Sequence, residues 1–296
     1  MTHVQKYWVA NSFIIRDPNI KEQQVKKLKA WIQNNNHIPN YVTDEQIVLF
    51  LHSNYYNIDT TKKCMEDYYK LRLKVPQFFE GRDINSDSLD KALRVLHYGI
   101  FPKKTPENYQ VVFHKLNNPD PLQYVFNDGF KLLSMMIDAV YAKEGPLPGL
   151  LILFDLTDVK IGHITRLPLN SVRKCLEYIQ DAIPIRLKGI HVLNVHPIID
   201  KIMMLIKPFL RKGFLSLIHF YKEGNIQDLY KVIPKSCLPS DYGGELESVQ
   251  YYHEEFITQM RNMRQLFIEE EELMCTKSKK SRSRTCELTL NSLEID

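Results

Sequence analysis

An uninterrupted apolar segment, Leu150–Phe154, restricts the fold of this chain more than any other feature of its sequence. Its residues, Leu-Leu-Ile-Leu-Phe, do not alternate with polar ones, so neither side of a strand formed here can face water. Strands of this kind belong to parallel sheets that are covered on both faces, because helical crossovers connect the strands. The segment therefore predicts an α/β fold with a parallel sheet between helices.

Strands and helices alternate along the chain on either side of this segment. Strands are predicted where β-branched and aromatic residues lie between turn signals, and helices where apolar residues recur at helical spacing. The predicted strands are Tyr109–Leu116, Gly189–Asn194 and Leu215–Phe220, and the predicted helices are Phe126–Ala142, Leu169–Ala182, Ile198–Leu210 and Ile226–Val232. Such alternation indicates βαβ units.

The residues before this region predict a small helical bundle. A lysine-rich helix is expected at Asn19–Gln33. Thr43 and Gln46 have the spacing of a capping box, which begins a second helix. A third helix runs from Asp59 until Pro76 ends it.

These patterns divide the chain into three parts. We expect a helical bundle at residues 1–90, a main α/β domain at 91–248 and a C-terminal part at 249–296. The C-terminal part is predicted to contain a helix at Tyr251–Met274, followed by a disordered tail rich in Ser, Lys and Arg.

Composition excludes several classes of function. With 39 basic and 35 acidic side chains the net charge is +4, so no nucleic-acid partner is expected. The chain lacks the common motifs of nucleotide binding and hydrolysis, and its histidines lack the close spacing of a metal site. We therefore expect no enzyme activity, no metal and no cofactor. Asp155, which ends the apolar segment, could act as a general base at the sheet edge or cap the following loop.

The sequence also indicates where the protein resides. Its N-terminus lacks the apolar core of a secretory signal, and no apolar segment is long enough to span a bilayer. Five scattered cysteines form no CxxC pair, which is typical of free thiols in a reducing compartment. A cytoplasmic protein is predicted.

The segment Ile198–Leu210 is strongly amphipathic. On a helix, Ile198, Ile202, Leu205 and Phe209 share a broad apolar face opposite the charged residues. Two interpretations remain open: the helix packs on the sheet, or it is a lid that covers an apolar cavity and rests on a bilayer when open. Basic residues that could meet anionic headgroups lie nearby, namely Arg186, Lys188, Lys207, Arg211 and Lys212.

Four segments in this order resemble the CRAL-TRIO lipid-binding family, whose members carry tocopherols or retinaldehyde. They are Gly149-Leu-Leu-Ile-Leu-Phe-Asp-Leu156, Ile183-Pro-Ile-Arg-Leu-Lys-Gly-Ile-His-Val-Leu-Asn194, Ile206-Lys-Pro-Phe-Leu210 and Leu238-Pro-Ser-Asp-Tyr-Gly-Gly-Glu245. The resemblance extends over about 109–245, and the N-terminal helices resemble the bundle that precedes this domain in the family.

The resemblance implies a mixed, mainly parallel sheet with flanking helices that enclose an apolar pocket under a mobile gate helix at about 195–211. It places the gate residues at Ile198, Ile202, Leu205 and Phe209. Arg186 and Lys188 match the two basic residues with which tocopherol carriers bind phosphoinositide headgroups. The implied pocket-lining residues are Met136, Leu150, Phe154, Leu167, Ile179, Ile183, Ile185 and Ile190.

A function follows from these expectations. We predict a monomeric carrier that binds one hydrophobic ligand, such as a tocopherol, a retinoid or a similar lipid. It would transfer this ligand between membranes, with an anionic membrane surface, including phosphoinositides, as its other partner. Two alternatives stay open: a regulatory or scaffold module that senses lipid and acts through a protein partner, and an enzyme that acts on a lipid.

Overall fold

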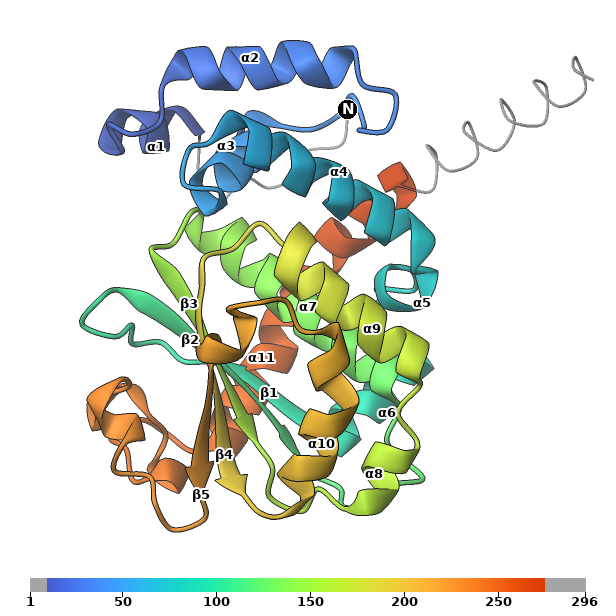
Figure 1. Cartoon of the computed structure of the whole chain (residues 1–296), viewed down its shortest axis with the longest axis vertical. Coiled ribbons are helices and arrows are strands. Elements are labelled where there is room, and N and C mark those ends of the chain that lie inside the picture. Colours follow the sequence, from blue (N-terminus) through green and yellow to red (C-terminus); the bar gives the residue numbers. More distant parts are fainter. Residues whose placement is uncertain (1–9, 275–296) are drawn as a thin grey trace, which may run out of the picture.

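A computed structural model describes residues 10–274 of the chain, and a five-stranded sheet forms its centre (Figure 1). Neighbouring strands follow one another in sequence order, from β1 to β5. β1 is antiparallel to β2, and the other three pairs are parallel, which confirms the mixed, mainly parallel sheet. The strands are β1 Leu96–Ile100, β2 Tyr109–Leu116, β3 Gly149–Asp155, β4 Leu187–Val195 and β5 Ile218–Lys222.

Crossover helices cover one face of this sheet. They follow β2, β3 and β4 in turn. Crossover connections between parallel strands are right-handed, so crossovers between consecutive strands of this sheet lie on the same face. Figure 1 shows α7, α9 and α10 together on this side. The elements are α7 Phe126–Glu144, α8 Ile161–Thr165, α9 Leu169–Glu177 with a π-helical turn Tyr178–Ala182, and α10 Ile198–Ile206 with a 3-10 turn Lys207–Phe209.

The opposite face is covered by a largely irregular segment at 223–248 and by α11, Val249–Asn262. Side chains alternate along β3, with Leu150 and Ile152 in the core that contains α7, and Leu151 and Leu153 in the core on the opposite side. Coverage on both faces is therefore confirmed, although the second layer contains few helices.

The predicted helix at Ile226–Val232 is wrong, because this stretch forms only the 3-10 turn Leu229–Lys231. Leu229 and Ile233 are fully buried against the sheet, and Pro234 disfavours a helical conformation in the residue before it. A single turn is enough to bury both side chains.

The N-terminal helices form a core of their own around Leu28, Ile47, Leu51 and Met65. Two predicted features are confirmed here: the Thr43 hydroxyl accepts from the Gln46 amide at 3.3 Å, and α4 ends just before Pro76. The helices are α1 Ala10–Arg16, α2 Glu22–Gln33, α3 Asp44–Ser53, α4 Ile58–Lys74, α5 Pro76–Phe79 and α6 Asp87–Val95.

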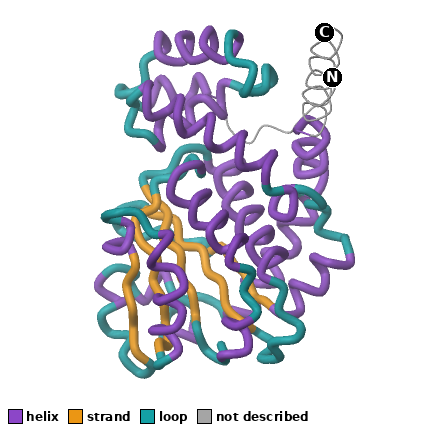
Figure 2. The backbone as a smooth tube through the Cα atoms, turned by 45° about the vertical axis from the view of Figure 1, so that its right-hand side comes forward, coloured by secondary structure: helices purple, strands orange, loops and turns teal. Residues whose placement is uncertain are grey.

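Figure 2 shows the N-terminal helices at one end of the molecule, and a buried charge network joins this helical region to the rest. Arg72 of α4 donates to Asp138 of α7 at 2.6 Å and to the Tyr178 hydroxyl at 3.3 Å. Arg82 contacts the same Asp138 carboxylate and pairs at 2.9 Å with Glu270 of the final helical stretch, 264–274. Buried charges are tolerated only when paired, so this network fixes how the parts dock.

Candidate functional site

Seven of the eight residues expected to line a pocket lie together on the helix side of the sheet. Met136 and Leu150 are fully buried there, whereas Phe154, Ile179 and Ile185 are only partly buried. Leu167 lies apart, half-buried in the loop between α8 and α9. The seven that belong to this cluster or pack against it are Met136, Leu150, Phe154, Ile179, Ile183, Ile185 and Ile190.

The apolar surface on this face continues to the β5 edge of the sheet. Phe154 pairs with Val192, and Val192 pairs with Phe220, so the three lie in one row across β3, β4 and β5. Phe220, at the end of the row, is 42% exposed. The sheet therefore presents uncovered apolar surface on the face that carries the crossover helices.

Helix α10 belongs to the same face (Figure 1), and its apolar side chains are only partly covered. Seven of its nine residues are Ile, Met or Leu, yet none of the nine is buried, and Met204 is 75% exposed. Ile198, Ile202 and Leu205 are half-buried and belong to none of the hydrophobic clusters of the described residues. An apolar helix is normally buried on at least one side, so α10 is only partly packed against the protein.

The C-terminal end of this segment is nevertheless anchored. The Gln180 side chain donates to the Phe209 carbonyl at 3.1 Å and accepts from the Arg211 amide at 2.7 Å. The Arg211 guanidinium also forms an ion pair with Asp181. These bonds fix the chain after α10 to the π-helical turn, whereas the apolar part of α10 lacks comparable contacts.

Two of the five predicted basic residues lie against aromatic rings. The Arg186 guanidinium donates to the His52 carbonyl at 2.8 Å and lies 4.4 Å from the centre of the Tyr55 ring. Lys188 Nζ is 3.3 Å from the Tyr55 hydroxyl and 5.8 Å from the centre of the Tyr109 ring. Arg186 therefore holds the end of α3 to the start of β4 in addition to carrying charge.

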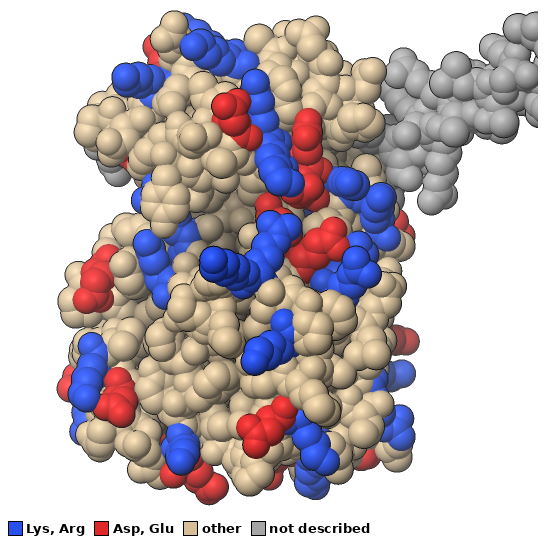
Figure 3. Space-filling model, viewed as in Figure 1, with Lys and Arg blue, Asp and Glu red and all other residues tan. Residues whose placement is uncertain are grey.

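The other predicted basic residues, Lys207, Arg211 and Lys212, are exposed after α10. Figure 3 shows Lys and Arg side chains on this face near the hollow between the N-terminal helices and the sheet domain. Arg211 is already paired with Asp181. Lys207 and Lys212 keep their charged ends at the surface.

Asp155 caps the loop that follows β3. Its carboxylate accepts hydrogen bonds from the Thr157 amide at 2.9 Å, Asn194 Nδ2 at 2.8 Å and the Tyr242 hydroxyl at 3.0 Å. Burial alone would raise the pKa of this carboxyl, but these hydrogen bonds bring the pKa below its ordinary value. Of the two interpretations of Asp155, the geometry supports the loop cap.

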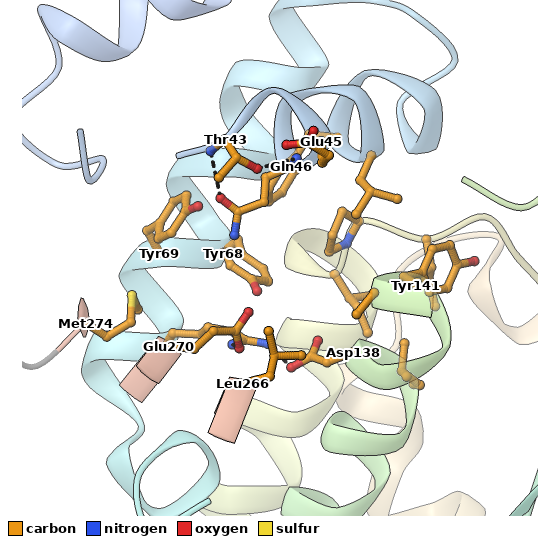
Figure 4. Close-up of a pocket in the computed structure, with 18 of the residues that line it drawn as sticks. Thr43, Glu45, Gln46, Tyr68, Tyr69, Asp138, Tyr141, Leu266, Glu270 and Met274 are labelled. Atoms are coloured by element: carbon orange, nitrogen blue, oxygen red, sulfur yellow. Dashed lines mark hydrogen bonds and ion pairs between the residues drawn. The ribbon is translucent and has the colours of Figure 1, made fainter. Parts of the chain in front are cut away.

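A separate cavity of about 230 Å³ lies where the N-terminal helices meet the main domain (Figure 4). Side chains from α3, α4, α7, the segment before β4 and the stretch 264–274 line it. Of the predicted pocket residues, Ile183 and Ile185 contribute to its wall. No sequence pattern predicts this cavity, because its walls come from segments that are far apart in the chain and share no local pattern.

Two possible features are not found in the part of the chain that the structure describes. Between residues 10 and 274, no helix has the length and apolarity needed to cross a membrane. Within the same range, no group of three or more His, Cys, Asp or Glu side chains is placed to hold a metal ion.

These features define the class of the protein: it is an α/β protein whose mixed sheet carries crossover helices on one face and is preceded by a helical region. A family model described as CRAL/TRIO domain matches residues 96–244, and the chain belongs to this family. Members of the family bind and transfer lipophilic ligands. A second model, described as a Pinta-like UBA domain, matches residues 17–89.

Several known proteins are similar to the chain. The alpha-tocopherol transfer protein-like protein of Homo sapiens is 24% identical over 203 residues, which cover 68% of this chain and 58% of that protein. Clavesin-1 of Xenopus laevis is 22% identical over 232 residues, which cover 78% of this chain and 70% of the relative. The crystal structure of Sfh5 has the same fold, with a TM-score of 0.52 and 11% identity over 78% of this chain and 90% of the other.

Proposed function

We propose that this protein carries one lipophilic molecule between membranes and holds it between α10 and the row formed by Phe154, Val192 and Phe220. The observation that carries the proposal is the state of α10, an apolar helix without a buried residue above a sheet face that is itself partly uncovered. Membership in a family that binds lipophilic ligands supports the same conclusion.

The energetics support a ligand or a bilayer as the missing partner of α10. Each CH₂ group removed from water stabilises the system by about 0.8 kcal/mol. Several isoleucine, leucine and methionine side chains of α10 are only half-buried. Burying them further would therefore stabilise the protein. A ligand would bury their inner side, and a membrane would bury the same helix when the carrier opens.

Transfer requires no chemical step in this proposal. Bilayer and binding site are both apolar, so the ligand can move between them near equilibrium, and membrane contacts need only shift the population toward an open form. We expect the ligand to be recovered unchanged. Tocopherols and retinoids have the required apolar character, and the human relative is named after its likeness to a tocopherol transfer protein.

The experiment that tests membrane transfer follows a fluorescent tocopherol analogue as it moves between anionic vesicles. Lys188→Glu combined with Lys212→Glu should slow transfer about tenfold or more, since a basic residue near an anionic surface contributes about 1 kcal/mol. Arg186 stays unchanged because it also holds the His52 carbonyl.

Lys91→Glu on α6, another exposed lysine, is the matched control and should transfer at the wild-type rate. Binding of the analogue in solution should be nearly the same in all three proteins. Equal transfer by the double variant and the wild type would remove Lys188 and Lys212 from the membrane surface of the carrier.

A second candidate function is lipid-dependent binding of a protein partner. The match of residues 17–89 to a Pinta-like UBA domain model favours it. This region lies outside the residues that match the CRAL/TRIO domain, so it could bind a partner of its own. Capture of partners by the loaded and the ligand-free chain would distinguish the two functions, since a pure carrier would capture the same proteins in both states.

A further inference from the structure

The cavity between the N-terminal helices and the main domain is distinct from the sheet face under α10. Its wall is mainly aliphatic and aromatic, and Leu49 of α3, Ile137 of α7 and Leu266 are typical members. No residue of α10, β3 or β5 lines it. A molecule bound here would contact both the region that matches the UBA model and the CRAL/TRIO domain.

The hydroxyl of Tyr68, at the wall of this cavity, is available for a hydrogen bond to a ligand. The ring of Tyr68 packs edge-on against Phe50 and Tyr69, with ring centres 5.2 and 5.1 Å apart, and the Arg72 guanidinium lies 4.4 Å from its centre. Its hydroxyl makes no hydrogen bond to any described residue, although Tyr68 is only partly buried and lines the cavity. Figure 4 shows the hydroxyl end directed into the space above Glu270 and Leu266.

The Tyr68 hydroxyl is a neutral hydrogen-bonding group. Burial raises its pKa well above the ordinary value of a tyrosine. A ligand that fills the cavity excludes water from this hydroxyl, and a hydroxyl without a partner in an apolar site costs free energy, so a ligand atom that accepts its proton would be favoured. This requirement selects a ligand with at least one hydrogen-bond acceptor.

The charged groups of the cavity select against an anion. Three carboxylates line it, those of Glu45, Asp138 and Glu270, against the single guanidinium of Arg72. Arg72 is already bound to Asp138 at 2.6 Å, and Glu270 is paired at 2.9 Å with Arg82. No cationic group that lines the cavity is left unpaired for an acidic ligand, so an anion would meet net negative charge.

We propose that this cavity is a second ligand site, which binds a small uncharged molecule with an apolar body and one hydroxyl or carbonyl oxygen that accepts from Tyr68. An apolar cavity of about 150 Å³ holds benzene, so the space of about 230 Å³ accommodates about two fused rings. Because the walls come from both regions, the bound molecule stabilises their docking by mass action.

The test uses 2-naphthol as the probe, with naphthalene and 2-naphthoate as controls, on the full chain. Calorimetry should give a dissociation constant on the order of 0.1 mM for 2-naphthol, in line with the affinity of ligands of this size. 2-Naphthoate should bind more weakly because of the carboxylates. Tyr68→Phe should weaken 2-naphthol about fivefold, which corresponds to a net hydrogen bond of about 1 kcal/mol, and should leave naphthalene unchanged.

A pair of identical substitutions locates the binding. Ala142 lines the cavity, whereas Ala30 is exposed on α2. Ala142→Leu should abolish binding of both neutral probes, and Ala30→Leu should not affect it. Both variants should still load lipid, which separates this site from the carrier site under α10.

The proposal is overturned if Tyr68→Phe and Ala142→Leu bind 2-naphthol as tightly as the wild type, if no probe binds, or if 2-naphthoate binds most tightly. Should Ala142→Leu fail to fold, Tyr68→Phe still decides the question. That substitution removes one oxygen atom and keeps the ring contacts with Phe50 and Tyr69.

Discussion

Single polar residues inside this protein mostly serve the fold. The carboxylate of Asp155, expected as a general base or a cap, receives four hydrogen bonds that hold the loop after β3. His114 of β2 stacks on Tyr98 with ring centres 4.6 Å apart and meets Phe154 edge-on at 5.5 Å. Sequence alone does not distinguish such buried residues from catalytic ones, because the difference depends on partners from other strands.

His114 makes the stability of the protein depend on pH. Burial lowers its pKa to about 4, whereas an unfolded histidine has a pKa near 6.5. Between these values the unfolded state binds more protons, so the free energy of unfolding decreases as the pH falls from about 6.5 to about 4. Above this window His114 is neutral in both states and has no effect.

The corresponding prediction compares the wild type with His114→Phe by urea unfolding at pH 7, 5.5 and 4.5. The wild type should lose more stability on acidification, with a difference in slope of up to about 1.4 kcal/mol per pH unit. Burial lowers the pKa of His52, His97 and His191 to about 4 as well, so the variant should retain part of the pH dependence. Identical slopes would show that His114 does not titrate as described.

At the scale of secondary structure, elements with a strong local signal were predicted well. β3 contains the continuous apolar segment Leu150–Phe154, β4 is rich in aliphatic and β-branched residues, and α3 has its capping box. β1 was missed because it is a short antiparallel strand, Leu96–Ile100, that directly follows α6 without a turn signal. The strand expected at Leu215–Phe220 begins instead at Ile218, since Phe214–Leu217 forms a 3-10 turn.

The gate interpretation of α10 makes a prediction at this scale. α10 lacks buried residues, whereas most residues of α7 are buried. In hydrogen-exchange mass spectrometry the α10 amides should therefore exchange much faster than those of α7 in the ligand-free chain. Loading with a lipid should slow exchange in α10 and leave α7 nearly unchanged.

Equal protection of the two helices without ligand would contradict a mobile α10. Slow exchange in α10 that does not respond to lipid would favour the other interpretation, a helix simply packed on the sheet. Gln180 and Asp181 anchor the residues 207–211. The amides of this stretch should therefore be protected from exchange both with and without lipid.

For the whole molecule, the sequence predicted the sheet domain and the preceding helices but not how they meet. The contacts that join them connect residues far apart in the chain, such as Arg72 with Asp138 and Arg82 with Glu270. No local pattern marks these partners, because each is an ordinary charged residue in its own segment of the chain. The cavity beside this network was missed for the same reason.

The central claim is that a lipophilic molecule binds against the sheet face that contains Phe154. Native mass spectrometry of the full chain after loading with α-tocopherol or with a lipid extract tests it most directly. The wild type should carry one ligand per chain, and Phe154→Asp should carry about tenfold less or none, because an uncompensated charge in an apolar site is costly. Tyr251→Asp, which changes an exposed aromatic residue of α11 on the opposite side of the sheet, should load normally. A wild-type chain that takes up no lipid, or a folded Phe154→Asp chain that loads as well as the wild type, would contradict the account.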